Sequence, residues 1–200
     1  MLWFLTITMI GSGAILAGVA LSRRRAQGSL RTLLLYGLGA GAFQAVPQAM
    51  AYLSVGHVGA GYVSIAFAFP LLVTYVMALV FRMEAFSVSR ALGVAVALAG
   101  GLMLVLAKFD GLSEDAAIWV LVVSAIPVVI AGGNLYRTRF WPVGAEPLPL
   151  AALMLLLGGL MLLPFAALTE GVSGVAALWR GPLIPLLTCA SVAVFALRFV

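Results

Sequence analysis

The sequence predicts an all-α fold, a polytopic membrane bundle of about seven transmembrane helices. Hydrophobic residues make up 64% of the chain and charged residues only 8%, and the mean hydropathy is +1.22. A soluble domain of 200 residues would keep much more of its surface charged. The charged residues also gather in short clusters, separated by uncharged runs of about 20 residues, the length that crosses a bilayer as a helix.

Seven apolar segments are the expected helices, each long enough to span the membrane. In chain order they are Leu2–Leu21, Arg31–Leu53, Gly59–Phe81, Val88–Ala107, Ala116–Tyr136, Pro147–Leu168 and Pro182 to about Val200. Charged residues mark several of their ends: Arg23 follows the first segment, Arg82 the third, Lys108 the fourth and Arg137 the fifth. The segments are about twice as long as a membrane β-strand and lack its alternation of polar and apolar residues, so a β-barrel is disfavoured.

The distribution of Lys and Arg between alternate loops predicts the orientation. The loops after the first, third and fifth segments hold eight of these residues, and the loops after the second, fourth and sixth hold two, Lys108 and Arg180. Loops rich in Lys and Arg remain in the cytoplasm, so the first set is expected on the cytoplasmic side of a bacterial inner membrane. The net charge of +5 follows from this bias and does not indicate nucleic-acid binding.

Two of the segments are similar to each other. Met9–Leu21 (MIGSGAILAGVAL) superposes on Leu156–Leu168 (LLGGLMLLPFAAL) with an offset of 147 residues. Chance similarity between two helices rich in Gly, Leu and Ala is the alternative explanation. Under the charge assignment the two segments cross the membrane in opposite directions, so the repeat would be inverted, as in many secondary transporters.

The region from Ala51 to Lys108 resembles the EamA family of the drug/metabolite transporter superfamily. In that family a helix start rich in small residues leads to a mid-helix proline, then to a glutamate at the helix exit, and then to a helix with paired glycines. The residues on those positions are Pro70, Glu84, Gly93, Gly100 and Gly101. The stretch Gly133–Pro164 is similar to the family's passage from its sixth into its seventh helix.

The resemblance implies ten helices in two inverted halves, with both termini in the cytoplasm. Residues 1–108 would then be a first EamA repeat that lacks its first helix, and residues 116–200 a second repeat that lacks its last helices, so an incomplete chain is expected. It also implies a secondary transporter that exports a small polar metabolite, amino-acid-like or drug-like, by alternating access. The expected partners are the lipid bilayer and this small-molecule substrate, and a homo-oligomer is left open. No enzymatic activity, cofactor or metal site is expected.

The best candidates for substrate contact lie on the second segment. Gly37, Gly41, Gln44, Gln48 and Tyr52 recur at spacings of three and four, so they share one face of a helix. Glutamines are costly in hydrocarbon, so this face is expected to point into the bundle. Gln44, Gln48 and Tyr52 would then line a polar cavity. The alternative is that the glutamines bond across helices and the glycines form a packing notch.

Two further residues are substrate-binding candidates. Arg198 falls opposite Gln48 when the seventh segment is aligned on the second, so it would offer a cation to a carboxylate substrate. Snorkelling of Arg198 to the membrane surface is the alternative. Asn134, in the fifth segment, is a weaker candidate, as are Tyr62, Ser64 and Tyr75. All four are expected to pack or to lie at the interface in preference to binding.

Three prolines within the segments are candidate hinges: Pro47, Pro70 and Pro127. A proline cannot donate to the helix ladder and clashes with the preceding turn, so each is expected to kink its helix. Each kink is either static or a hinge for alternating access. Glu84, at the exit of the third segment, is expected to pair with Arg82 or Arg90 in solvent in preference to carrying a proton.

Other classes of protein fit the sequence less well. An intramembrane serine protease needs a Ser and His pair, but Ser12 is expected within a helix and His57 in an external loop. A retinal protein needs a lysine in its last helix, and the only lysine, Lys108, ends the fourth segment. A seven-helix sugar transporter is the better rival, because Pro47 and Gln48 form one proline–glutamine pair. A structural membrane protein that transports nothing is also left open.

Overall fold

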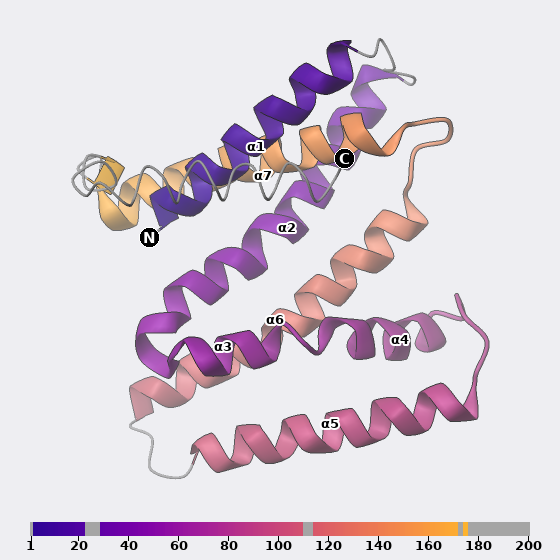
Figure 1. Ribbon diagram of the computed structural model, residues 1–200, viewed down its shortest axis with the longest axis vertical. Coiled ribbons are helices and arrows are strands. Elements are labelled where there is room, and N and C mark those ends of the chain that lie inside the picture. Colours follow the sequence, from indigo (N-terminus) through magenta and orange to yellow (C-terminus); the bar gives the residue numbers. More distant parts are fainter. Residues whose placement is uncertain (1, 23–28, 110–113, 172–173, 176–200) are drawn as a thin grey trace. The chain divides into compact units, whose positions relative to one another are not determined.

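The computed structural model describes residues 2–22, 29–109, 114–171 and 174–175, and the elements in these residues are all α-helices (Figure 1). They are α1 (Leu2–Ser22), α2 (Leu30–Val58), α3 (Ala60–Ala66), α4 (Pro70–Val80), α5 (Val88–Phe109), α6 (Glu114–Arg139) and α7 (Pro147–Glu170). The predicted all-α class is therefore confirmed. The segment predicted after Pro182 lies outside the described residues, and so does Arg198.

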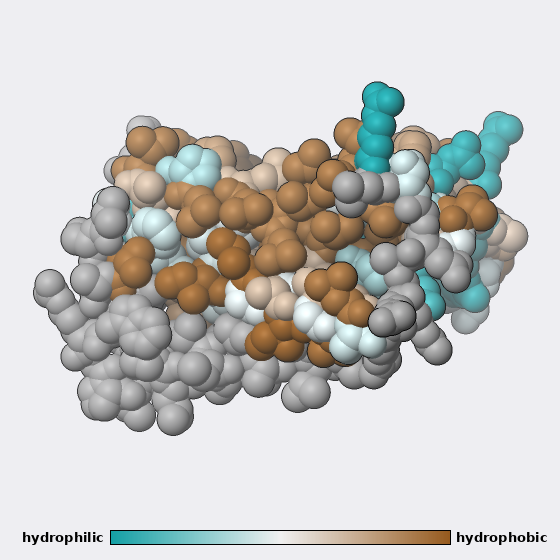
Figure 2. Space-filling view, turned by 90° about the horizontal axis from the view of Figure 1, so that it is seen from above, coloured by the Kyte–Doolittle hydropathy of each residue, from teal (hydrophilic) through white to brown (hydrophobic). Residues whose placement is uncertain are grey.

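Four of the described helical stretches are long and apolar enough to cross a membrane: α1, the α3–α4 stretch Ala60–Val80, α6 from Ala117 onward, and α7. Large hydrophobic side chains also lie on the outside, such as Leu168, which is 85% exposed. Among the residues that are coloured by hydropathy in Figure 2, hydrophobic ones predominate. These are the features of a membrane protein, as predicted. Gln44 and Gln48 interrupt the apolar character of α2, and the count of seven spans stays a prediction.

The helices form two compact units, which are described separately. The terminal unit contains α1, the first part of α2 up to Ala49 and, from Tyr136 onward, the end of α6 and α7. The central unit, from Met50 to Leu135, contains the end of α2, all of α3, α4 and α5, and most of α6. The predicted repeats, residues 1–108 and 116–200, divide the chain differently and stay a prediction.

In the terminal unit, α1 and α7 lie side by side and run in opposite directions (Figure 1). A Cβ atom added at Gly13 would lie 2.8 Å from the backbone nitrogen of Leu156. One added at Gly159 would lie 3.1 Å from the backbone nitrogen of Ile10. Small residues at these positions let the two backbones approach closely, which is a common way for membrane helices to associate. The two helices in contact are the ones that contain the predicted repeat.

The start of α1 is bonded to the end of α7. The Glu170 carboxylate accepts hydrogen bonds from the backbone nitrogens of Leu2, at 2.6 Å, and Trp3, at 3.3 Å. The Trp3 indole nitrogen donates to the carbonyl oxygen of Gly171 at 2.8 Å. The first N–H groups of a helix have no acceptor within it and lie at the positive end of the helix dipole, so a carboxylate stabilises them.

α2 meets α7 in the terminal unit at a pair of glycines. A Cβ atom added at Gly41 would lie 2.8 Å from the backbone nitrogen of Gly158 and 2.9 Å from the carbonyl oxygen of Met154. An aromatic cluster joins the same part of α2 to the end of α6, where the rings of Tyr36 and Tyr136 stack with centroids 5.8 Å apart. The first part of α2 is therefore held on both sides within this unit.

The core of the central unit lies where α2, α3 and α6 meet. Its buried side chains are Ala51, Val58, Val63, Ala66, Val120, Val123 and Ile126. At one end of this core the His57 ring stacks on Trp119, with centroids 4.3 Å apart and an interplanar angle of 5°. α2 runs to Val58, past its predicted end at Leu53. His57 is therefore in the last turn of a helix, and the prediction that it lies in a loop is wrong.

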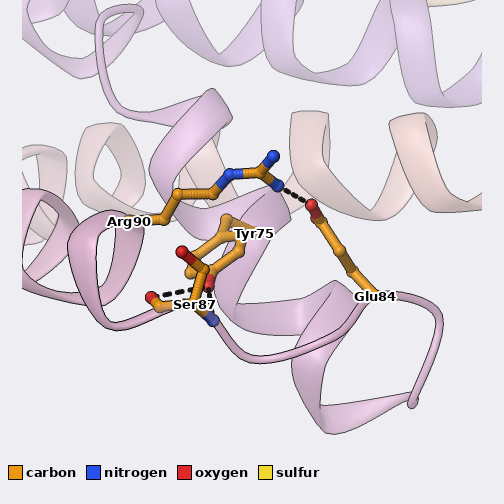
Figure 3. Close-up of polar contacts among 4 residues, drawn as sticks. All are labelled: Tyr75, Glu84, Ser87 and Arg90. Atoms are coloured by element: carbon orange, nitrogen blue, oxygen red, sulfur yellow. Dashed lines mark hydrogen bonds and ion pairs between the residues drawn. The ribbon is translucent and has the colours of Figure 1, made fainter.

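The connection between α4 and α5 is fixed by polar contacts (Figure 3). The Tyr75 hydroxyl accepts a hydrogen bond from the Ser87 nitrogen at 3.2 Å and donates to the Ser87 carbonyl oxygen at 3.3 Å. The Arg90 guanidinium forms an ion pair with the Glu84 carboxylate, and both side chains are exposed. The predicted pairing of Glu84 is thus confirmed, with Arg90 as the partner.

Candidate functional site

The span Ala60–Val80 is broken into two helices. The sequence predicted one helix, Gly59–Phe81, kinked at Pro70. In the structure α3 ends at Ala66, residues 67–69 form a turn, and Pro70 is in the first turn of α4. Pro70 has no N–H to donate to the Ala66 carbonyl, and the Phe69 nitrogen approaches that oxygen instead, at 3.4 Å. The prediction of a single kinked helix is corrected to a break just before Pro70.

The first turn of α4 is tied to α6 by a chain of hydrogen bonds. The Thr74 hydroxyl donates to the Pro70 carbonyl oxygen at 2.6 Å, and the Asn134 side-chain nitrogen donates to the Thr74 hydroxyl oxygen at 3.1 Å. Since the Thr74 proton is directed at Pro70, its oxygen is available as the acceptor for Asn134. Asn134 therefore links two helices of the central unit. Its predicted contact with a substrate stays a prediction.

A cavity of about 250 Å³ lies beside the break, within the central unit. Four helices contribute to it: α3 and α4 with the turn between them, α5, and α6 around its internal proline. The lining residues are Tyr62, Ile65, Ala66, Phe69, Val73, Leu98, Gly101, Val123, Ser124, Pro127 and Val128. An apolar cavity with a few polar groups is the usual form of a small-molecule site, so this cavity is the candidate functional site.

The polar groups of the cavity wall are two hydroxyls. The oxygens of Tyr62, on α3, and Ser124, on α6, are 3.2 Å apart and hydrogen-bonded. The Ser124 hydroxyl also donates to the Val120 carbonyl oxygen at 2.8 Å. The other described residues of the wall are apolar, and none of them is charged. The cavity therefore suits an uncharged group with limited hydrogen bonding.

Close packing of a glycine shapes one side of the cavity. A Cβ atom added at Gly101, on α5, would lie 2.5 Å from the Cζ atom of the Phe69 ring. The neighbouring Gly100 has nothing within 4 Å of such an atom. Of the paired glycines that carry the family resemblance, Gly101 is thus the one that admits the Phe69 ring.

The residues of the predicted polar face of α2 are not among those that line the cavity. Gln44, Gln48 and Tyr52 are half-buried and do not line it. Of the glycines on the same face, Gly41 contacts the backbone of α7, and a Cβ atom at Gly37 would lie 3.0 Å from the Leu157 side chain. For the glycines, the packing notch weighed as an alternative is what the structure contains. A role for Gln44, Gln48 and Tyr52 in binding stays a prediction.

The three predicted hinge prolines occupy different settings. Pro47 lies inside α2 and is buried, Pro70 begins α4, and Pro127 lies inside α6 and lines the cavity. Pro70 and Pro127 thus belong to the elements that surround the cavity. Whether any of the three acts as a hinge stays a prediction.

Sequence reasoning missed Ser124, Phe69 and Thr74 and ranked Tyr62 low. Ser124 lies three residues before Pro127, and Phe69 precedes Pro70. Polar or aromatic residues within one turn of a proline in an apolar span were the signal that could have found them. Tyr62 meets Ser124 across 62 residues of sequence, which no local pattern predicts.

The two residues weighed for a serine protease have other contacts. The Ser12 hydroxyl donates to the Thr8 carbonyl oxygen at 2.6 Å, and the His57 ring is stacked on Trp119. Among the residues that the structure describes, no three His, Cys, Asp or Glu side chains are placed to hold a metal ion.

Comparison of this chain with protein-family models, with curated proteins and with solved structures finds no match. The resemblance to the EamA family therefore depends on the sequence motifs alone.

Proposed function

We propose that this protein is a secondary transporter of the EamA type, which exports a small metabolite across a bacterial inner membrane by alternating access. The observation that carries the proposal is the broken span Ala60–Val80 beside a cavity. Discontinuous helices form the substrate sites of many secondary transporters. Irregular backbone at membrane depth is tolerated where it is buried in protein or lines a cavity. Phe69, in the turn, lines this one.

The antiparallel packing of α1 on α7 supports the same proposal. These two helices contain the similar segments Met9–Leu21 and Leu156–Leu168. An inverted repeat places equivalent helices in opposite directions, and α1 and α7 run in opposite directions in the terminal unit. The proposed orientation, with the loops after α1, α4 and α6 in the cytoplasm, follows from their arginines.

In the proposed mechanism the turn at residues 67–69 is the pivot. It lacks the full helical hydrogen bonding of α3 and α4, so a change of its backbone angles alters fewer bonds than bending a continuous helix. The hydrogen bond from Asn134 to Thr74 couples α4 to α6, and Pro127 weakens α6 beside the cavity. Movement of α4 with this part of α6 would open and close the cavity.

Replacing Pro70 with Ala tests the pivot. Alanine restores an N–H that can donate to the Ala66 carbonyl, so the variant favours a continuous helix. We expect solute exchange to fall by about tenfold, which corresponds to a shift of about 1.4 kcal/mol between the two conformations. The measurement is counterflow in proteoliposomes with a panel of radiolabelled amino acids, radiolabelled nucleosides, which are uncharged aromatic solutes with N–H and O–H donors, and the fluorescent cation ethidium.

Pro164→Ala is the matched control, because Pro164 lies inside the continuous helix α7 and is exposed. It is expected to exchange solute at the wild-type rate. If wild-type vesicles exchange none of the panel faster than protein-free vesicles, the transport proposal fails. If both proline variants behave alike, transport stands and the pivot is wrong.

A further inference from the structure

The two hydroxyls of the cavity present acceptors and no free donor. The Ser124 proton is directed at the Val120 carbonyl oxygen, at 2.8 Å. In the hydrogen bond of 3.2 Å between Tyr62 and Ser124, the donor is therefore the Tyr62 hydroxyl. A hydroxyl whose proton is already donated in one hydrogen bond can still accept another through its oxygen lone pairs. A ligand that bonds to this pair must consequently bring an N–H or O–H of its own.

Pro127 makes the same wall still poorer in donors. Proline has no backbone N–H, so residue 127 cannot donate to the carbonyl of Val123 one turn earlier in α6. Val123 and Pro127 both line the cavity, next to Ser124. This side of the cavity thus combines hydroxyl oxygens with a helix segment that has lost one donor.

The remaining wall selects for an uncharged, flat group. The side chains of Tyr62 and Phe69 provide aromatic surface, and the rest of the described lining is aliphatic or glycine apart from Ser124. Aromatic rings pack favourably against other rings, whereas an ion transferred to such a wall loses its hydration without gaining a counter-charge. The volume of about 250 Å³ lies below the range of roughly 300–1,000 Å³ for drug-sized sites, so it suits one or two rings.

We infer that this cavity binds the uncharged aromatic part of the transported solute, which donates an N–H or O–H hydrogen bond to the Tyr62 hydroxyl oxygen. The inference rests on the proposed transport function, and it narrows the substrate class to aromatic molecules with a neutral donor. An acyl chain of a membrane lipid is the other occupant that an apolar cavity could take, and it would form no such hydrogen bond.

Indole and N-methylindole test the hydrogen bond, because a methyl group replaces the N–H hydrogen in the second compound and removes the donor. Binding of each to the purified protein in detergent is measured by isothermal titration calorimetry, for the wild type and for Tyr62→Phe. The extra methyl group and partition into detergent affect both proteins equally. We expect the preference for indole over N-methylindole to fall by roughly fivefold in Tyr62→Phe, the value of one hydrogen bond.

The position of the ligand is tested with two adjacent glycines of α5. Gly101→Leu places a side chain against the Phe69 ring and into the cavity, whereas Gly100→Leu adds the same side chain at a position where nothing lies within 4 Å of the Cβ atom. We expect indole affinity to fall by about tenfold or more in Gly101→Leu and to stay within about twofold in Gly100→Leu. Tryptamine has the same indole ring with a positively charged aminoethyl side chain. It is expected to bind the wild type at least about tenfold more weakly than indole.

Three results would overturn the inference: no binding of indole to the wild type, equal loss of affinity in Gly101→Leu and Gly100→Leu, or an unchanged indole preference in Tyr62→Phe. The last would mean a plain apolar cavity of the kind an acyl chain fills. Counterflow of the solute panel separates these failures from failure of the transport proposal. If a charged solute is exchanged and indole does not bind, the transport proposal holds and the proposed substrate class is wrong. If indole binds and Gly101→Leu weakens it, but no solute of the panel is exchanged, the cavity binds an aromatic ligand and the transport proposal is wrong.

Discussion

The two units of the molecule differ in how their helices meet. In the terminal unit, glycines bring backbones together, at Gly13 between α1 and α7 and at Gly41 between α2 and α7. In the central unit the helices meet through larger side chains, one span is broken before Pro70, and a cavity remains between α3, α4, α5 and α6.

The terminal unit is therefore closely packed at its helix contacts, whereas the central unit contains a cavity beside a broken helix. Close backbone contacts leave no room for a change of packing, because protein interiors are dense and compress little. A cavity and a broken helix leave that room. Among the described residues, the cavity and the broken helix on which the proposed mechanism depends lie in the central unit, while the terminal unit contains the close backbone contacts.

The strongest test of this contrast is Gly41→Ala in the terminal unit. The added methyl group would lie 2.8 Å from the Gly158 nitrogen and 2.9 Å from the Met154 carbonyl oxygen, both of them backbone atoms that cannot rotate away. We expect the free energy of unfolding to fall by about 1–3 kcal/mol, as in other overpacked cores. Denaturant unfolding of the purified protein in detergent measures it.

Gly93→Ala is the control for this change, since nothing lies within 4 Å of a Cβ atom at Gly93. Alanine is favoured over glycine in a helix, so this variant is expected to be as stable as the wild type or more stable by up to about 1 kcal/mol. If Gly41→Ala matches it, the close approach of α2 and α7 is wrong, and the terminal unit is not the more tightly packed one.

Composition predicted the fold class because it depends on no long-range contact. Uncharged runs of spanning length can bury their backbone polar groups only as helices, so the all-α membrane protein followed directly. Helix ends were predicted less well, as in α2, which continues past Leu53 to Val58. The sequence contains no helix breaker between those two residues except Gly56, and the residues beyond Leu53 find a partner in α6, where Trp119 stacks on His57.

The candidate site was predicted only in part. Local chemistry identified Pro70 as a point of weakness, but whether a proline kinks or breaks a helix depends on what surrounds the freed groups. At Pro70 the freed group is the Ala66 carbonyl oxygen, which the Phe69 nitrogen approaches at 3.4 Å. The polar face of α2 was conspicuous in the sequence because glutamine is rare in apolar runs. Ser124 could not be singled out in the same way, because it is one serine among many small residues. Its role in the cavity wall depends on the contact with Tyr62, which only the structure shows.

A smaller effect is expected at the bond between α4 and α6. A double-mutant cycle with Asn134→Ala and Thr74→Val measures the coupling between these side chains through denaturant unfolding. Hydrogen bonds between membrane helices average about 0.6 kcal/mol, and we expect a coupling near that value. A coupling indistinguishable from zero would mean that the central unit is looser still, with α4 held to α6 by apolar contacts alone.

The smallest effect is expected at Glu84, the only acidic residue between α4 and α5. Its ion pair with Arg90 joins side chains that are 38% and 62% exposed. Water screens such a pair, and ordering two long side chains offsets much of the attraction. Glu84→Gln is therefore expected to change the free energy of unfolding by less than about 0.5 kcal/mol, because the two hydrogen bonds between Tyr75 and Ser87 still hold the connection. The core of the central unit is made of buried apolar side chains, so an ion pair in solvent is expected to add little to its stability. A loss above about 1 kcal/mol in low salt that disappears in high salt would instead make Glu84 a structural clamp on α4.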